Sequence, residues 1–141
     1  MDTQVKIAGV TFKNPVMTAS GTFGSGAEYG EYVDLNRLGA VTTKGVANVP
    51  WPGNPTPRVC ETYGVNVCGK TEEDYVEVVE RLGEEPAVSM LEINVSCPNV
   101  KEGAIAFGQK ADALYHITKE IKAKAKQPVI MKLSPNVTDI T

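Results

Sequence analysis

A thiol and two carboxamides stand together where one apolar segment of this 141-residue chain ends. Residues 93–99 read Ile-Asn-Val-Ser-Cys-Pro-Asn, so the segment changes quickly from apolar to polar groups. A strand that is buried on both faces is normally hydrophobic throughout, so Asn94 needs a polar partner there. Pro98 cannot continue a ladder and favours an extended Cys97, which fixes the thiol at the carboxyl end of the strand. The Cys97 thiol is therefore the first candidate for chemistry.

Four other apolar segments also end in a polar residue. In an α/β barrel the carboxyl ends of the strands form the active site, so such groups would meet on one rim around one ligand. Lys132 is the strongest case, because it interrupts an apolar run and a buried ammonium needs an anionic partner. For any single residue, a polar strand end that faces water is the alternative. The five candidates for this rim are Ser20, Lys44, Asn66, Asn94 and Lys132.

Glu92 is an acidic candidate on the same segment as Asn94. Side chains two residues apart on a strand point to the same side, so Glu92 would share the face of Asn94. It could line a barrel interior, where it would either make a structural hydrogen bond or take part in catalysis. The sequence leaves both roles open.

Strands and helices must alternate along the chain to place these residues on one rim. Residues 5–12 are typical of an antiparallel hairpin that turns at Ala8-Gly9. Thr71 offers a helix cap with acidic residues behind it, followed by one apolar face. The alternation predicts a parallel sheet, open or closed into a barrel. Strands are expected at 14–21, 39–45, 65–69, 90–95 and 129–133, and helices at 26–38, 71–82 and 111–125.

Composition and charge exclude several classes of protein. Apolar residues make up 42% of the sequence, enough for a core, and no apolar run approaches the ~20 residues of a membrane span. The net charge is −3 with dispersed Lys and Arg residues, so no basic stripe is available for nucleic acid or anionic lipid. The start of the chain lacks a basic and then apolar leader, so we expect a cytoplasmic protein.

The cysteine and histidine residues argue against a metal site or a disulfide framework. The three cysteines form no C-x-x-C pair, so neither a zinc ribbon nor an iron–sulfur cluster is expected from this chain alone. Cys60 and Cys68 are interpreted as core or loop thiols. His116, the only histidine, lies on the helix expected at 111–125, so no Ser-His-Asp set or multi-histidine metal site can be built.

Five motifs follow one another along the chain: Thr-Ala-Ser-Gly-Thr-Phe-Gly (18–24), Thr-Lys-Gly (43–45), Gly-Asn-Pro (53–55) with Arg58, Ile-Asn-Val-Ser-Cys-Pro-Asn (93–99) with Gly103 and Gly108, and Met-Lys-Leu-Ser-Pro-Asn (131–136). Together they resemble the catalytic subunits of dihydroorotate dehydrogenases, most closely the NAD-linked class of bacteria and archaea. The resemblance implies a (β/α)8 TIM barrel that binds FMN and oxidises dihydroorotate to orotate in pyrimidine biosynthesis. The related dihydropyrimidine dehydrogenases share the thiol-bearing motif and are an alternative.

The resemblance also implies a role for each matched position. Cys97 matches the catalytic base, which would take a proton from a substrate carbon beside a carbonyl while a hydride leaves its neighbour for flavin N5. An ordinary thiol, with a pKa of about 8.5, is a weak base that nearby ammonium groups could bring closer to the working pH. Lys132, near the flavin N1 edge, would stabilise the charge that arrives with the hydride. The implied flavin contacts are Ser20, Lys44, Gly45, Asn66, Asn94 and Lys132, and the implied substrate contacts are Lys44, Asn94 and Asn99.

The resemblance further implies a lid and partners. Residues 103–108 are expected to form a lid that places Cys97 and excludes water. Because this chain offers neither cluster ligands nor a dinucleotide fold, electrons bound for NAD would leave through another subunit that carries FAD and an iron–sulfur cluster. A homo-oligomer is also expected.

The chain departs from the family pattern in two places. Between Lys44 and Asn66 stand prolines and no helix, yet two parallel strands need a crossover of about a dozen residues or more, usually helical. We therefore expect one βα unit of ~30 residues to be missing after Gly64, either deleted or unobserved. The last three strands of a barrel of about eight are also missing. The chain is thus expected to be a single domain, with a hairpin over 1–13 and barrel units over 14–141. It would carry about the first five strands of the barrel. Because such an incomplete barrel has open edges, we expect the chain as it stands to bind FMN poorly.

A nucleotide-binding P-loop is the alternative interpretation from a different class of protein. Residues 64–71 fit the pattern G-x-x-x-x-G-K-[ST], which cradles phosphate. We interpret the match as accidental, because Val-Asn-Val-Cys favours extended structure where the loop needs an anion nest. A non-catalytic barrel fragment that only assembles with other subunits is the remaining alternative.

Overall fold

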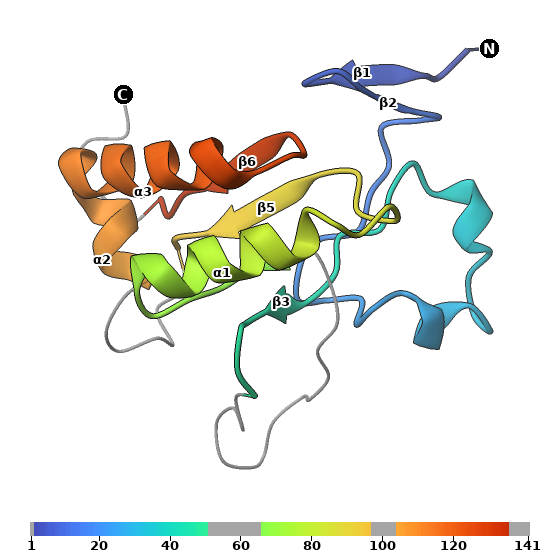
Figure 1. Ribbon diagram of the computed structural model, residues 1–141. Coiled ribbons are helices and arrows are strands. Elements are labelled where there is room, and N and C mark those ends of the chain that lie inside the picture. Colours follow the sequence, from blue (N-terminus) through green and yellow to red (C-terminus); the bar gives the residue numbers. More distant parts are fainter. Residues whose placement is uncertain (1, 51–65, 97–103, 136–141) are drawn as a thin grey trace.

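The centre of the molecule is a four-stranded parallel sheet in the order β3-β4-β5-β6, and a separate hairpin, β1-β2, precedes it (Figure 1). This is a computed structural model, which describes residues 2–50, 66–96 and 104–135. No helix in these three ranges is long and apolar enough to cross a membrane. The strands are β1 (Val5–Ile7), β2 (Val10–Phe12), β3 (Gly45–Val46), β4 (Asn66–Val67), β5 (Leu91–Asn94) and β6 (Val129–Lys132). The helices are α1 (Glu72–Leu82), α2 (Ala104–Gln109) and α3 (Ala111–Lys124), with short 3-10 helices η1 (Ala27–Tyr29) and η2 (Leu35–Arg37).

The structure confirms the hairpin and the predicted alternation of strands and helices in the second half of the chain. The helices α1 and α3 and the strands β5 and β6 all lie within their expected ranges. β5 and β6 pair in parallel from Leu91↔Val129 to Asn94↔Lys132. At the hairpin turn, Ala8 and Gly9 both have positive φ, 49° and 88°. That geometry suits a two-residue turn between twisted antiparallel strands.

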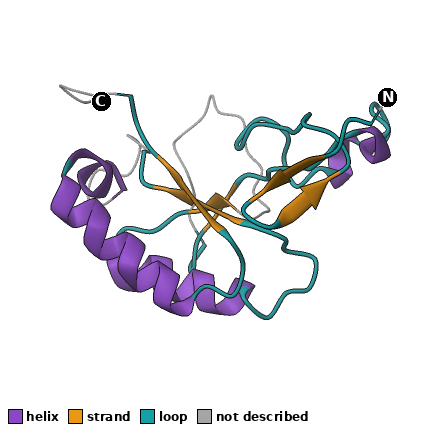
Figure 2. Cartoon of the chain, turned by 90° about the horizontal axis from the view of Figure 1, so that it is seen from above, coloured by secondary structure: helices purple, strands orange, loops and turns teal. Residues whose placement is uncertain are grey.

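The two faces of the sheet differ in polarity. Leu91, Ile93 and Val95 are fully buried on the face that α1 and α3 cover (Figure 2). The residues between them point to the opposite side, because side chains alternate along a strand. That opposite side, here called the polar face, carries Asn66, Glu92, Asn94 and Lys132. The core on the helix side consists of Val67, Tyr75, Val78, Val79, Leu91, Ile93, Val95, Ile117 and Ile121.

A capping box starts α1, as the sequence predicts. Thr71 Oγ1 accepts from the Asp74 N–H at 3.2 Å, and Asp74 Oδ2 accepts from the N–H groups of Thr71 and Lys70 at 3.2 and 2.9 Å. Asn48 Nδ2 donates to Asp74 Oδ1 at 2.9 Å. Burial acts to raise the pKa of Asp74, but the hydrogen bonds from Lys70, Asn48 and Thr71 outweigh it and hold the pKa below its ordinary value.

Asp74→Asn is therefore expected to lower the free energy of unfolding by about 1 kcal/mol at neutral pH. Since the pKa of Asp74 is depressed in the folded state, its contribution is complete above about pH 5 and is lost as the pH falls below about 4. Urea unfolding of both proteins over this range measures the difference. Asp112→Asn, in the exposed first turn of α3, removes an equal charge where the described chain shows no such hydrogen bonds, and serves as the control. A difference that stayed constant down to about pH 3 would contradict the prediction.

The segment before β3 departs from the predicted elements. The strand expected at 14–21 is reduced to one parallel bridge between Met17 and Ala40. The helix expected at 26–38 is replaced by η1 and η2. Gly26 precedes η1 with a φ of 96°, which a helix interior does not allow. Asp34 Oδ1 then accepts from the Asn36 N–H at 3.0 Å and starts a new turn, so local bonds displace a continuous helix.

Residues 104–109 form α2, where the sequence suggested a lid over 103–108. A Cβ atom on Gly108 would lie 2.3 Å from the Val95 carbonyl oxygen, so only glycine lets this helix approach the end of β5 so closely. Gly103 lies outside the described residues. The described part of the segment is thus a packed helix, and its role as a lid stays a prediction.

The P-loop pattern does not form a phosphate loop in the part of the chain that the structure describes. Asn66 and Val67 are extended in β4 and pair with both neighbouring strands. Gly64, the first residue of the pattern, lies outside the described residues. The extended conformation agrees with the interpretation of the match as accidental.

Candidate functional site

Strand register brings the polar residues expected at the rim side by side. Asn66 on β4 pairs with Gly45 on β3 and with Glu92 on β5. Asn94 and Lys132, the last residues of β5 and β6, pair with each other. Residues paired across a sheet project on the same side, so these side chains share the polar face at the carboxyl ends of β5 and β6.

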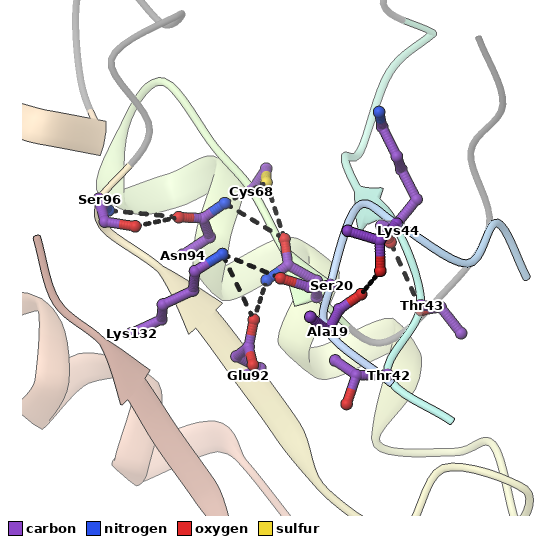
Figure 3. A network of polar contacts seen from close by, with 12 residues as sticks. Ala19, Ser20, Thr42, Thr43, Lys44, Cys68, Glu92, Asn94, Ser96 and Lys132 are labelled. Atoms are coloured by element: carbon purple, nitrogen blue, oxygen red, sulfur yellow. Dashed lines mark hydrogen bonds and ion pairs between the residues drawn. The ribbon is translucent and has the colours of Figure 1, made fainter. Parts of the chain in front are cut away.

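Lys132 joins the end of the sheet to the N-terminal part of the chain. Its Nζ donates to Ser20 Oγ at 2.9 Å, although the two residues are 112 positions apart (Figure 3). The same Nζ lies 3.9 Å from Glu92 Oε1, so Glu92 is the anionic partner that the sequence required. The Lys132 side chain is 40% exposed, so its ammonium is only partly buried and can still reach a ligand.

The two carboxamides are held in fixed orientations. Asn66, only 2% exposed, donates through Nδ2 to Glu92 Oε1 at 2.5 Å and accepts through Oδ1 from Asn94 Nδ2 at 3.3 Å. Asn94 Oδ1 in turn accepts from the N–H and the hydroxyl of Ser96, at 3.3 and 2.9 Å. A buried amide needs its partners, and this chain of hydrogen bonds supplies them.

Cys68 belongs to the same group, which the sequence did not predict. It is buried, as expected of a core thiol, but its Sγ lies 3.4 Å from Asn66 Oδ1 and 3.7 Å from Asn94 Nδ2. A Cβ on Gly45 would stand 2.6 Å from that sulfur, so Gly45 allows the close approach of β3. The spacing of two residues between Asn66 and Cys68 was the available signal, because it places both on one face of a strand.

Tyr75 is a second residue that the sequence analysis missed. It was not singled out from the apolar face expected after Thr71, and it is fully buried on α1. Its hydroxyl donates to the Asn94 carbonyl oxygen at 2.7 Å. A helix residue thereby fixes the end of β5, where Asn94 leaves the strand.

One candidate among the described residues is not brought into this group. Lys44 lies at its margin, where its N–H donates to the Gly24 carbonyl at 3.1 Å and its side chain extends away from the Lys132 contacts (Figure 3). Cys97 and Asn99 lie outside the described residues. The group therefore joins Ser20, Gly45, Asn66, Asn94 and Lys132, together with Glu92 and Cys68.

Donors dominate the chemistry of this group. It offers an ammonium and amide N–H groups, with one carboxylate held among them. Such a set suits a ligand rich in carbonyl oxygens and ring nitrogens. Within residues 2–50, 66–96 and 104–135, no three His, Cys, Asp or Glu side chains gather in a way that could hold a metal ion.

Comparison with known proteins gives matches along the whole chain. The family model for dihydroorotate dehydrogenase matches residues 2–64 and 64–141. The chain is 61% identical to the dihydroorotate dehydrogenase B (NAD(+)) catalytic subunit of Lachnoclostridium phytofermentans, over 100% of this chain and 57% of that protein. It is 53% identical to the subunit of the same name from Alkaliphilus metalliredigens, over 97% of this chain and 56% of that protein.

The structural comparison addresses the fold alone. A crystal structure of DHODH from Eimeria tenella in complex with ferulenol matches with a TM-score of 0.74 and 21% sequence identity. The match covers 97% of this chain and 53% of that one. It confirms the predicted fold class, a (β/α)8 barrel of which this chain carries a part. The chain spans a little over half the length of the curated relatives that it matches.

The same comparisons locate the missing segment. The two parts of the family match meet at residue 64. The alignment with the Lachnoclostridium protein runs over 173 residues, 32 more than the 141 of this chain, all of which it covers. The additional residues are therefore internal, and their number agrees with the predicted gap of ~30 residues after Gly64. That they form one βα unit stays a prediction.

Proposed function

This chain belongs to the dihydroorotate dehydrogenase family, and on that premise we propose that the protein oxidises dihydroorotate to orotate in pyrimidine biosynthesis, with FMN as its cofactor. The observation that carries the proposal is the contact of Lys132 with Ser20 beside the two linked carboxamides. These are positions that the family resemblance assigns to the flavin. They come from distant parts of the sequence, and the fold brings them together.

The described residues fit FMN through the chemistry of their donors. The Lys132 side chain is 40% exposed, so its ammonium could bind the oxygens and nitrogens of a flat heterocycle beside the linked amides of Asn66 and Asn94. Gly45, which pairs with Asn66, has no side chain, so β3 packs closely against Cys68 at this point. When bound, FMN would supply the acceptor for a hydride. The Lys132 charge would then favour the more negative state of the ligand.

Cys97 is proposed as the base, on the family resemblance, since it lies outside the described residues. Oxidation of dihydroorotate removes a proton from one carbon and a hydride from its neighbour, and a carbon–carbon double bond forms between them. The proton would pass to the Cys97 sulfur. The preceding residue, Ser96, donates hydrogen bonds to Asn94 Oδ1, so the last described residue before Cys97 lies beside the site. This position supports the proposed role.

Lys44, Asn94 and Asn99 are proposed to bind the substrate. No acidic side chain among the described residues pairs with the Lys44 ammonium, so its charge is available for a substrate carboxylate. Lys44 and Gly45 remain proposed flavin contacts as well. Asn99, like Cys97, carries this role on resemblance alone.

The proposal includes a second subunit as electron acceptor. The relatives are named catalytic subunits of an NAD(+)-dependent enzyme, which supports transfer of electrons to a partner. We propose that the partner carries FAD and an iron–sulfur cluster, that the catalytic subunit is a homo-oligomer, and that the complex works in the cytoplasm.

Anaerobic mixing of the intact, flavin-loaded protein with dihydroorotate tests the function. The flavin absorbance should bleach, with one orotate formed for each flavin reduced. Dihydrouracil provides the comparison, because reduction by dihydrouracil and not by dihydroorotate would favour the dihydropyrimidine dehydrogenase alternative. A colourless protein that binds its partner subunit but no flavin would instead favour a non-catalytic module.

A further inference from the structure

Glu92 lies between two residues that the proposed function uses. One oxygen, Oε1, accepts from Asn66 Nδ2 at 2.5 Å and lies 3.9 Å from Lys132 Nζ (Figure 3). Its side chain is 23% exposed, against 40% for Lys132. The carboxylate is thus the more sheltered member of the pair.

The strand register explains this position. Glu92 pairs with Asn66 on β4, whereas Lys132 pairs with Asn94, two residues further along β5. The Lys132 side chain therefore reaches back along the sheet to approach Glu92. It reaches Ser20 with the same nitrogen, at 2.9 Å. Two partners from different segments fix where the ammonium stands.

The charge of Glu92 opposes that of Lys132. At 3.9 Å the two opposite charges attract each other, and solvent screens this attraction only in part because the Glu92 carboxylate is mostly buried. An ammonium paired in this way presents less net positive charge to a bound ligand than a free ammonium would. The strength of the Lys132 charge at the site is therefore set by its partner.

We infer that Glu92 is a positioning residue, which orients Lys132 and Asn66 and limits how far Lys132 stabilises reduced FMN over oxidised FMN. The inference rests on the proposed function. Glu92 need not touch FMN or substrate, since it acts through the two residues that do. The alternative is that Glu92 only ties β4 to β6 and has no effect on the cofactor.

Glu92→Gln in the intact protein separates these two roles. Glutamine keeps the shape and an acceptor for Asn66 but removes the charge. The ratio of affinities for reduced over oxidised FMN should rise at least about tenfold, which is a potential more positive by about 30 mV for a two-electron couple. Flavin fluorescence titrations and a redox titration with a reference dye measure both quantities without turnover. Glu77→Gln removes an equal charge from α1 and should leave the potential unchanged.

A conservative variant and a stability measurement complete the test. Glu92→Asp keeps the charge, so its potential should stay closer to the original than that of Glu92→Gln. Equal potentials in all three proteins, with only a lower urea midpoint in the variants, would overturn the inference and leave Glu92 a structural link. Equal shifts in Glu92→Asp and Glu92→Gln would also overturn it. Failure of the unmodified protein to bind FMN would instead refute the proposed function, so the two failures are distinguishable.

Discussion

Cys97→Ser should slow the reduction of bound FMN by dihydroorotate about 100- to 10,000-fold, the usual contribution of a positioned general base. A serine hydroxyl at neutral pH is a far weaker base than a thiolate, so the substrate proton would have no good acceptor. Anaerobic stopped-flow mixing measures the rate of flavin bleaching directly. The rate in the unmodified protein should increase with pH as the thiol ionises, and the variant should lose that dependence.

The flavin itself should be unaffected by this change. The visible spectrum and FMN affinity of Cys97→Ser should match those of the unmodified protein, because Cys97 is assigned to the substrate and not to the cofactor. Cys97→Ala serves as the matched variant, since it removes the hydroxyl too and should be at least as slow. Reduction at an unchanged rate in either variant would remove Cys97 from the role of base.

The second half of the fold could be predicted from sequence because its elements have strong periodic patterns. In α1 and α3 the apolar residues recur at helical spacing and meet the buried side of β5, so local and tertiary preferences agree. The segment before β3 carries no such pattern. There Gly26 and Asp34 decide the local conformation, and backbone angles of this kind are not visible in hydrophobic periodicity.

The sequence predicted part of the membership of this group of polar residues but not its contacts. Ser20 and Lys132, 112 positions apart, meet as expected of residues on one rim, although Ser20 follows an isolated bridge at Met17 and not a full strand. The partners of Lys132 and Asn66 depend on register, which a sequence of short strands does not specify. This is why Glu92 was left between two roles and why Cys68 was interpreted only as a core or loop thiol.

Lys132→Met is expected to weaken FMN binding about 10- to 100-fold, as for loss of a hydrogen bond from a charged donor. Methionine has a similar length and keeps the apolar stem of the side chain, so β6 should keep its packing. Loss of the ammonium also removes the positive charge that favours the more negative, reduced state, so the potential of the flavin that still binds should become more negative. Fluorescence titration and redox titration measure the two effects.

Lys119→Met, on the exposed side of α3, removes the same charge and should change neither the FMN affinity nor the potential. An unchanged affinity in Lys132→Met would take this lysine out of the cofactor site.

The double variant Glu92→Gln with Lys132→Met links this expectation to the role of Glu92. Substitutions at residues in contact are not additive when one residue acts through the other. If Glu92 acts mainly by restraining Lys132, its replacement should shift the potential much less once Lys132 is gone than it does in the unmodified protein. Two shifts that simply add would mean that the Glu92 charge reaches the flavin directly, and the positioning role would then fail even though both residues matter. The cycle therefore tests the mechanism of the pair, which neither single substitution can do alone.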